Sequence, residues 1–319
     1  MKKVLIKTLI VCVVVLLLPF ILTMLFAENN EPKSREAMDF SIYYLENGAK
    51  DKISFDDYLI GVLAANMPAG YEMEALKAQA VIARTYAMYN VALLEKDDPD
   101  KTTFTTSELG LSYLSLDSLE KFWGKEDYNN FLTKLENAVY DTNDKVLVYD
   151  DKLIFPAFFS TGSGFTRNAS EAWGIDIPYL TSVSSKQDVT STDYLHIQEF
   201  AVADLISLLE KYYTDIDLSK DKFFDEVKVS SRDSTGYALK VNLGKKTVSG
   251  EEFAKVTGLS SNHFYIEEYE NKARVICNGS GHGVGLSQYG ANAMAEEGSD
   301  YTDILKHYYT GVSLSSLSE

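Results

Sequence analysis

EMEALKAQAVIARTYAMYNVALLE, residues 72–95, is an alanine-rich stretch that is expected to pack closely against its neighbours. Alanine is the strongest helix former, and its small side chain lets neighbouring elements approach a helix closely. The alanines that matter stand at positions 75, 78, 80, 83 and 87. The segment is therefore predicted to form one long helix that contacts other elements tightly.

The segments on either side of this helix carry a mixture of strand and helix signals. Residues 40–53 are predicted as two strands joined at Asn47-Gly48, and Ser54 is predicted to cap a helix that Pro68 ends. The next expectations are a long loop with short helical pieces at 97–125, a helix at 127–141 and a hairpin at 146–159 turning at Asp150-Asp151. They are followed by a helix at 193–215, strands within 225–243 and a short helix capped by Ser249 and Glu252. The chain is then expected to form strands at 263–269 and 273–277 and two C-terminal helices. This mixture predicts an α+β fold with one large domain of helices and antiparallel strands, which has room for a smaller inserted subdomain.

The N-terminus predicts a membrane anchor. Residues 8–26 are uncharged and mostly Val, Leu and Ile, which is long enough for a helix to cross a bilayer. Lysines precede this run, so the N-terminus is expected in the cytoplasm and the rest of the chain outside the cell membrane. The predicted domains are an anchor at 1–27, a polar tether at 28–38 and an extracytoplasmic domain at 39–319. The alternative is a cleaved signal peptide, although Phe26 and Ala27 offer no clean small-x-small cleavage site.

Charge and cysteine content exclude several classes of function. The formal net charge of −17 argues against nucleic acid as a partner. Cys12 lies in the apolar N-terminal run and Cys277 near the C-terminus, so no intramolecular disulfide is expected. The four histidines and two cysteines show no spacing typical of a structural zinc site.

One group of candidate residues lies on and just before the long helix. Asn66-Met67-Pro68 precedes it, and Lys77 and Arg84 are seven residues apart, so they share one helix face. Two cations on a helix that is otherwise expected to be buried need partners or a ligand. The simpler interpretation is a solvated face on which long side chains keep their charges in water.

A second group lies in the glycine-rich segment 278–290, NGSGHGVGLSQYG. Glycines at alternate positions permit positive φ and close approach of the backbone to a ligand, with His282 in their midst. The Lys-Ser/Thr ending of a phosphate-binding loop is absent. Ser287 has no acid and histidine partner visible in the sequence, so a serine nucleophile is weakly indicated. A third segment, FFSTGSGFT at 158–166 with Trp173 and PYL at 178–180, is unspecific by composition alone.

Together these segments resemble the SpoIID/LytB family. The stretches ALKAQAVIARTY (75–86), FFSTGSGFT to SV (158–183) and GHGVGLSQYGANAMAEEG (281–298) occur in the order typical of that family, and YTDILKHYYTGV (301–312) also fits. The resemblance spans roughly 40 to 315.

The resemblance implies a lytic transglycosylase that acts on peptidoglycan. Such an enzyme cuts the bond between N-acetylmuramic acid and N-acetylglucosamine and leaves a 1,6-anhydro end. The setting implied is engulfment during sporulation, in the septum between the mother cell and forespore membranes. The implied partners are peptidoglycan glycan strands and the stage II sporulation proteins P and M, and no cofactor is implied.

The resemblance also assigns residues to a site. The catalytic group comprises Asn66, which occupies the position of the family's acid/base glutamate, and the basic pair Lys77 and Arg84. Substrate contacts would come from Tyr179, Asp188, His282, Ser287 and Tyr289. Some members bind zinc through a Cys and a His that follow the first serine of the segment matching FFSTGSGFT. Residues 161–165 hold neither here, so no metal is expected.

Three hypotheses arise, because an amide cannot replace a proton-carrying carboxyl group. The first is an active transglycosylase in which Glu72, Glu74 or Asp188 replaces the missing acid. The second is a glycan-binding scaffold with weak or no cleavage that stimulates a partner hydrolase. The third is an unrelated serine hydrolase built on Ser287 and His282, whose short spacing gives poor triad geometry.

Overall fold

A computed structural model describes residues 40–46 and 49–317. The predicted anchor at 1–27, the tether at 28–38 and the Asn47-Gly48 turn therefore lie outside the described residues. Within them, no helix combines the length and apolar character that a membrane crossing requires. The chain divides into the units Met1–Ser41 and Ile42–Glu319. The second unit mixes helices with mainly antiparallel strands, which confirms the α+β class.

The predicted hairpin and capped helix are both present. Strands β1 (Ser41–Glu46) and β2 (Ala49–Ile53) pair antiparallel. Helix α2 (Phe55–Asn66) begins where the Ser54 side chain accepts a hydrogen bond from the Asp57 N–H at 3.0 Å. The 97–125 region contains the expected helical piece as α4 (Leu116–Trp123) and also a short strand, β3 (Thr103–Thr105). This strand was not predicted, and it completes a sheet in the order β2-β1-β3.

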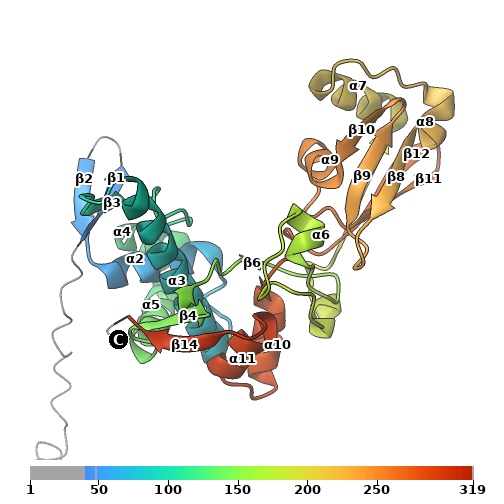
Figure 1. The fold of residues 1–319 in the computed structure, drawn as a ribbon. Helices are drawn as coiled ribbons and strands as arrows, with labels where there is room; N and C mark the ends of the chain where they lie inside the picture. Colours follow the sequence, from blue (N-terminus) through green and yellow to red (C-terminus); the bar gives the residue numbers. More distant parts are fainter. Residues whose placement is uncertain (1–39, 47–48, 318–319) are drawn as a thin grey trace, which may run out of the picture. The chain divides into compact units, whose positions relative to one another are not determined.

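Helix α3 (Met73–Asp97) is the long helix predicted from the alanine-rich stretch. It contacts α2, α5 (Lys125–Asp141), α10 (Gln288–Glu296), α11 (Tyr301–Tyr308) and β4 (Lys145–Tyr149). These elements come from distant parts of the sequence (Figure 1). Every alanine singled out in the sequence is fully buried, at positions 75, 78, 80, 83 and 87. Small side chains thus let α3 serve as the packing centre of this part of the chain.

Strand β4 lies in a sheet with the order β14-β4-β5. It turns into β5 (Lys152–Leu153) through Asp150 and Asp151, whose φ angles of 48° and 57° are those of a tight hairpin turn, as predicted. The second strand of the predicted 146–159 hairpin is shorter than expected, because it ends at Leu153, and Phe158 and Phe159 join a different sheet. The other edge is β14 (Ser313–Ser316), which follows the two predicted C-terminal helices. Strand β14 was not predicted, because it is polar apart from one leucine.

Residues 195–278 build two further antiparallel sheets, in the orders β10-β9-β8 and β11-β12-β7. They share one core, centred on Leu205, Leu209, Phe253 and Phe264, that is drawn entirely from residues between 202 and 277. The strands are β7 (Leu195–Ala201), β8 (Val227–Arg232), β9 (Ala238–Leu243), β10 (Lys246–Ser249), β11 (Phe264–Tyr269) and β12 (Lys272–Asn278); the helices are α7 (Val202–Tyr212), η2 (Lys220–Lys222), α8 (Phe223–Glu226) and α9 (Gly250–Thr257) (Figure 1). Ser249 caps α9 by accepting from the Glu252 N–H at 3.0 Å, as predicted.

The helix predicted at 193–215 is wrong in its first half. Residues 195–201 form β7, which pairs along its whole length with β12, for example Ile197 with Ile276. The helix begins only at Val202, and its buried positions Val202, Leu205 and Leu209 follow helical spacing. Pairing with a strand that lies about eighty residues later in the sequence decided the structure of β7, and no local pattern reports such pairing.

Two short strands bring distant segments together. Strand β6 (Phe158–Phe159) pairs in parallel with β13 (Leu286–Ser287). Isolated bridges also join Thr161 to Ser280 and Arg167 to Val284, between residues that follow β6 and residues that precede β13. Helix α6 (Ala169–Trp173) and the 3-10 helix η1 (Lys186–Thr190) follow β6. The FFSTGSGFT segment and the glycine-rich segment therefore lie side by side.

Candidate functional site

Asn66 is the last residue of α2, and its side chain is anchored to the backbone. Its amide donates to the Val62 carbonyl at 2.7 Å and to the Ser112 carbonyl at 2.8 Å. The Asn66 backbone carbonyl accepts from the Gln288 side chain at 2.8 Å, which links α2 to the start of α10. Among the described residues, no carboxylate hydrogen-bonds to the Asn66 amide. The amide is thus held as a donor at the carboxyl end of a helix.

Lys77 is held between two carboxylates. Its ammonium lies 3.0 Å from Glu74 on the same helix and 3.0 Å from Asp141 at the end of α5. Burial disfavours the charged form, but the hydrogen bonds to Glu74 and Asp141 outweigh it and raise the pKa of Lys77. Glu74 also accepts from the Tyr301 N–H at the start of α11, at 3.0 Å. This cluster ties α3 to α5 and α11.

Arg84 lies on the same face of α3 and reaches the same helix end. Its side chain donates to the backbone carbonyls of Val139 at 3.1 Å, Thr142 at 2.8 Å and Lys145 at 3.2 Å. Val139 lies in the last turn of α5 and Thr142 caps it, where backbone acceptors have no partner within the helix, whereas Lys145 is the first residue of β4. Arg84 is only 2% exposed. The shared face predicted for Lys77 and Arg84 is real, and it faces α5.

Asp188 and Ser287 meet in a buried network. The Ser287 hydroxyl donates to Asp188 at 2.6 Å, and both residues are fully buried. Burial raises the pKa of the Asp188 carboxyl, although the Ser287 and Ser185 hydroxyls act against this. The Ser287 oxygen also accepts from the Gly290 N–H at 3.2 Å and so caps α10. The Asp188 and Ser287 side chains join η1 to α10, and the neighbouring Tyr289 hydroxyl hydrogen-bonds to Thr190 at 3.2 Å.

This geometry gives Ser287 the contacts of a helix cap. A serine nucleophile needs a histidine base at hydrogen-bond distance and access to substrate. The Ser287 hydroxyl instead donates to a carboxylate and is fully buried. The His282 Nδ1 accepts from the Val284 N–H at 3.1 Å, within its own loop. The hypothesis of a serine hydrolase has no support in this arrangement.

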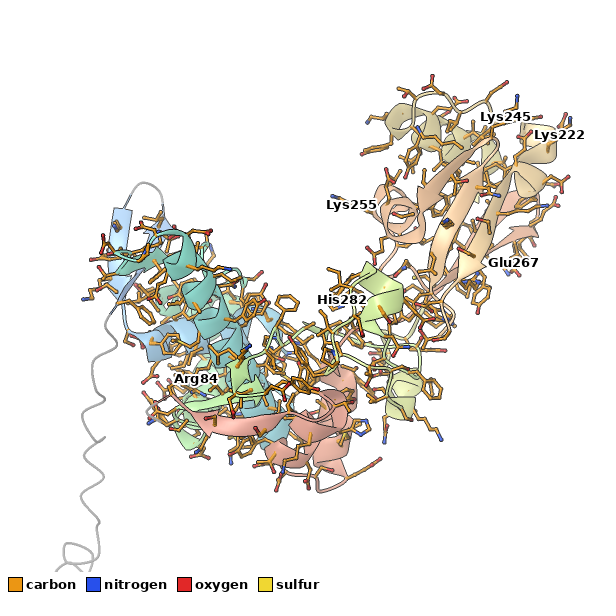
Figure 2. The ribbon with its side chains drawn as sticks, viewed as in Figure 1. Arg84, Lys222, Lys245, Lys255, Glu267 and His282 are labelled. Atoms are coloured by element: carbon orange, nitrogen blue, oxygen red, sulfur yellow. The ribbon has the colours of Figure 1, made fainter. Side chains whose placement is uncertain are left out.

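His282 lies in the glycine-rich loop and packs among aromatic rings. Its ring centroid lies 5.5 Å from that of Trp173 and 5.8 Å from that of Phe159. Figure 2 shows it beside α6, the helix that carries Trp173. Burial lowers the pKa of His282 to about 4, and the nearby Arg167 charge acts in the same direction. The imidazole is therefore neutral at physiological pH. The Arg167 guanidinium donates to the His282 carbonyl at 3.0 Å, which holds the loop from its buried side.

The loop needs its glycines for two separate reasons. Gly285 has φ of 81°, which favours glycine, and a Cβ there would overlap the Ala157 carbonyl oxygen. Gly281 has φ of 108°, and a Cβ there would lie 2.7 Å from the Phe159 side chain. The backbone of the loop can therefore lie directly against β6, as the parallel β6–β13 pair requires.

A row of partly exposed aromatic rings extends from His282. Trp173 contacts Phe155 with a centroid separation of 6.2 Å, and Phe155 contacts Tyr86 at 5.4 Å and Tyr89 at 5.8 Å. The rings come from α3, the segment after β5, α6 and the glycine-rich loop. We call Tyr86, Tyr89, Phe155, Trp173 and His282 the aromatic row. Such rings present apolar faces with a negative quadrupole, and the C–H faces of sugar rings stack on surfaces of this kind.

Tyr179 supports this row. Its hydroxyl accepts from the Phe155 N–H at 3.0 Å, and its ring packs on Tyr149 with a centroid separation of 5.6 Å. Burial raises the pKa of the Tyr179 hydroxyl, so it stays protonated. Sequence reasoning named Tyr179 and His282 but did not select Phe155, Tyr86 or Tyr89. The available signal was the density of aromatic residues in the same ordered segments, and it does not reveal which rings meet.

Metal ligation is not indicated by the side chains that the structure describes. Among them, no group of three or more His, Cys, Asp or Glu residues is close enough to hold a metal ion. Cys277 is buried in β12.

Comparison with known proteins shows the family to which this chain belongs. A family model described as stage II sporulation protein (SpoIID) matches residues 46–149. Stage II sporulation protein D of Bacillus amyloliquefaciens is 34% identical across 95% of this chain and 93% of that protein. Stage II sporulation protein D of Bacillus subtilis (strain 168) is 32% identical across 99% and 96% of the two chains. The chain belongs to the SpoIID family of stage II sporulation proteins, as its ordered motifs predicted.

A more distant relative adds a link to the cell wall. The amidase enhancer of Bacillus subtilis (strain 168) is 30% identical across 81% of this chain, which spans 40% of that protein. The name of that relative refers to the stimulation of an amidase.

Proposed function

We propose that this protein binds peptidoglycan glycan strands during sporulation and holds them for a partner cell-wall hydrolase, with little or no cleavage of its own. The observation that carries the proposal is the Asn66 amide, which donates to the Val62 and Ser112 carbonyls where a transglycosylase needs a carboxyl group. Membership of the SpoIID family and the likeness to an amidase enhancer support the cell-wall setting.

Cleavage by the transglycosylase route needs one group that first gives and then takes a proton. It must protonate the leaving oxygen and then accept the proton of the attacking C6 hydroxyl. An amide does neither at physiological pH. Of the carboxylates proposed as substitutes, Glu74 is bound to Lys77 and Tyr301, and Asp188 is fully buried. Glu72 is exposed at the start of α3. Transglycosylase activity therefore remains a prediction, and it requires that one of these carboxyl groups act as the acid and the base.

Glycan binding is the part of the family's task that the side chains support directly. The aromatic row offers stacking surfaces, and its rings are fixed by mutual contacts and by the Tyr179–Phe155 hydrogen bond. Binding of this kind works for an acidic protein, because stacking and hydrogen bonding to sugars do not depend on opposite charge.

We further propose the location that the sequence predicts. The segment 1–27 would anchor the chain in the cell membrane with its N-terminus in the cytoplasm. The domain would then lie in the space between the mother cell and forespore membranes. The stage II sporulation proteins P and M are the proposed partners, with the former as the hydrolase that benefits.

The proposal is tested with the full chain, purified in mild detergent and mixed with peptidoglycan sacculi. Sedimentation measures binding, and mass spectrometry of the soluble fraction detects anhydro-muropeptides. Trp173→Ala is expected to weaken binding about tenfold, because it removes a stacking surface. Trp123→Ala is the matched control, since Trp123 is also partly exposed but packs on Phe131, away from the row.

Two outcomes would contradict the proposal. Abundant anhydro-muropeptides from the natural chain would show that Asn66 does not prevent cleavage. Equal loss of binding in Trp173→Ala and Trp123→Ala, with both variants folded, would show that the aromatic row is not where glycan binds.

A further inference from the structure

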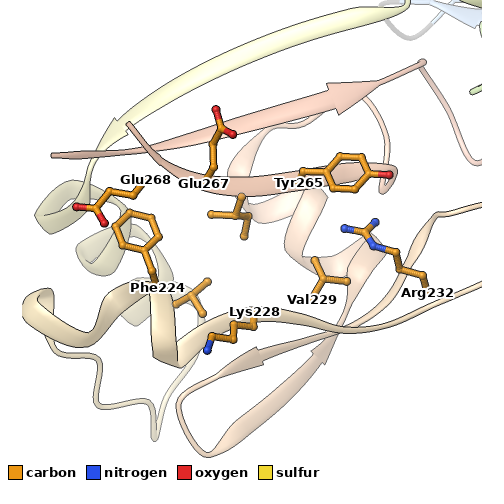
Figure 3. Close-up of a pocket in the computed structure, with 9 residues that line it drawn as sticks. Phe224, Lys228, Val229, Arg232, Tyr265, Glu267 and Glu268 are labelled. Carbon is orange, nitrogen blue, oxygen red and sulfur yellow. The ribbon is translucent and has the colours of Figure 1, made fainter. Parts of the chain in front are cut away.

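A groove lies between strands β8 and β11, and none of its lining residues belongs to the aromatic row. Its volume is about 410 Å³. Figure 3 shows Arg232 and Tyr265 at one end and Phe224 and Glu268 at the other. The lining comes from α8, β8 and β11, and consists of Phe224, Val227, Lys228, Val229, Arg232, Tyr265, Ile266, Glu267 and Glu268.

Both walls of this groove are sheet edges. Strand β8 is the last strand in the order β10-β9-β8, and β11 is the first in the order β11-β12-β7. Each pairs with a neighbouring strand on one side only, so half of its backbone N–H and C=O groups point away from its own sheet. The link between the walls is the Arg232 side chain, which donates to the Phe264 carbonyl at 2.8 Å. Beyond that link, no backbone hydrogen bond joins β8 to β11 in the described residues.

The floor of the groove is apolar. Val227 is buried, and Phe224, Val229 and Ile266 are half-buried and pack against the core beneath the two sheets. An extended chain placed between the edges would find backbone partners on both sides. Its alternate side chains would point toward this floor.

The charges at the rim are unevenly satisfied. Lys228 is paired with Asp225 at 3.1 Å. Glu267 points away from β8 in Figure 3 and lies 3.6 Å from Arg274. Glu268 is exposed and has no ion pair among the described residues. A basic group on the occupant would complement Glu268. A second copy of this chain would instead bring its own net charge of −17.

We propose that the β8–β11 groove binds an extended, basic segment of a partner protein, which adds as a strand between the two sheets. The recognition is by main-chain hydrogen bonds to both edges, by alternating apolar side chains on the floor and by a Lys or Arg against Glu268. This surface shares no residue with the aromatic row, so a protein partner and a glycan strand would not compete for the same side chains. The inference does not depend on whether the chain cleaves or only holds glycan.

The experiment uses the full chain and a fluorescent synthetic peptide of about six residues that alternates valine with lysine. Fluorescence anisotropy measures binding, and hydrogen exchange followed by mass spectrometry locates it. Binding is expected to slow amide exchange in both β8 and β11. A peptide of the same length with proline at alternate positions is expected not to bind, because proline removes the backbone N–H donors that face one of the two edges.

Charge reversal provides the matched pair of variants. Glu268→Lys is expected to weaken peptide binding about fivefold, since it places a like charge at the rim. Glu270→Lys makes the same change two residues away, outside the groove lining, and is expected to leave binding unchanged. Val229→Lys places a charge on the floor and is expected to abolish binding, with circular dichroism confirming its fold.

Four results would overturn the proposal. The first is an absence of peptide binding, and the second is slowed amide exchange outside β8 and β11 when the peptide binds. The third is an equal effect of Glu268→Lys and Glu270→Lys on peptide binding. The fourth is concentration-dependent self-association that slows amide exchange in both strands. The first would mean that Lys228 and the irregular register at Val229 and Ser231 merely protect a sheet edge. The last would make a second copy of the chain the occupant.

Discussion

The Asn66 side chain lies in surroundings that would suit an acid. Two backbone carbonyls, of Val62 and Ser112, face it, and it ends the twelve-residue helix α2. Carbonyl oxygens and the negative end of a helix dipole both disfavour a carboxylate and would raise the pKa of a glutamate placed there. A raised pKa is what a general acid needs. The natural amide instead donates to both carbonyls, which stabilises the fold and leaves no proton to transfer.

His282 gives a prediction for the pH dependence of stability. In the folded chain its pKa is about 4, against 6.5 for an unperturbed histidine. Between these values the unfolded chain binds a proton that the folded chain does not, so stability falls as the pH drops through this window. The loss is roughly 3 kcal/mol at most. Urea unfolding at neutral and mildly acidic pH should show a larger loss for the natural chain than for His282→Asn.

A histidine NMR titration provides the direct check on this residue. If the His282 resonance titrated near the unperturbed value, the imidazole would be charged in mild acid. The natural chain and His282→Asn should then lose the same stability between neutral and mildly acidic pH.

Among the helices, α5 is expected to depend on the buried Arg84 for the stability of its last turn. Arg84→Met removes hydrogen bonds to three backbone carbonyls, and it should lower the free energy of unfolding by about 3 kcal/mol. Lys96→Ala, an exposed position on the same helix as Arg84, should change it by less than about 0.5 kcal/mol. Urea denaturation measures both. Equal effects of the two substitutions would show that the α5 carbonyls do not depend on Arg84.

Two glycines, one inside the glycine-rich loop and one beyond it, allow the cost of steric overlap to be separated from the cost of backbone strain. Gly285 and Gly298 both have positive φ, of 81° and 95°, but only at Gly285 does a Cβ meet other atoms. Gly298→Ala should cost about 1 kcal/mol of stability from strain alone. Gly285→Ala must also displace the Ala157 carbonyl, just before β6, so it should cost clearly more. Thermal unfolding compares them, and equal costs would mean that β6 and the loop are not in close contact.

Elements with local signals were predicted well from the sequence. The Ser54 and Ser249 caps, the Asp150-Asp151 turn and the alanine-rich helix depend on interactions within a few residues, and the structure confirms each. Strand β7 was missed because its identity depends on pairing with β12. Short strands such as β14 bury too little to leave a pattern in the sequence.

The candidate site divides in the same way. Helical spacing placed Lys77 and Arg84 on one face of α3, but nothing local could show that α5 covers that face. Only the family resemblance assigned Asp188 and Ser287 to one site, and it did not predict the hydrogen bond between them. The aromatic row combines rings from four separate segments, and the contacts between them exist only once the chain has folded.

For the chain taken as one body, the net charge of −17 predicts an unusual salt dependence. Cell-wall material also carries carboxylates, so long-range repulsion should oppose binding at low ionic strength. Raising salt from about 0.01 M to about 0.15 M shortens the screening length from roughly 30 Å to roughly 8 Å. Sedimentation with sacculi should therefore show equal or stronger binding at the higher salt. A steep loss of binding would instead indicate a basic surface that contacts anionic groups.

In the function proposed for it, this chain keeps a glycan-binding site and lacks only the proton-carrying group at Asn66. The decisive experiment is to quantify anhydro-muropeptides released from sacculi by Asn66→Glu, with Asn66→Gln as the control that lengthens the side chain but keeps the amide. We predict anhydro ends from Asn66→Glu alone, with sacculus binding similar in both variants. Anhydro ends from Asn66→Gln or from the natural chain would contradict this prediction, as would a folded, glycan-bound Asn66→Glu variant that makes none.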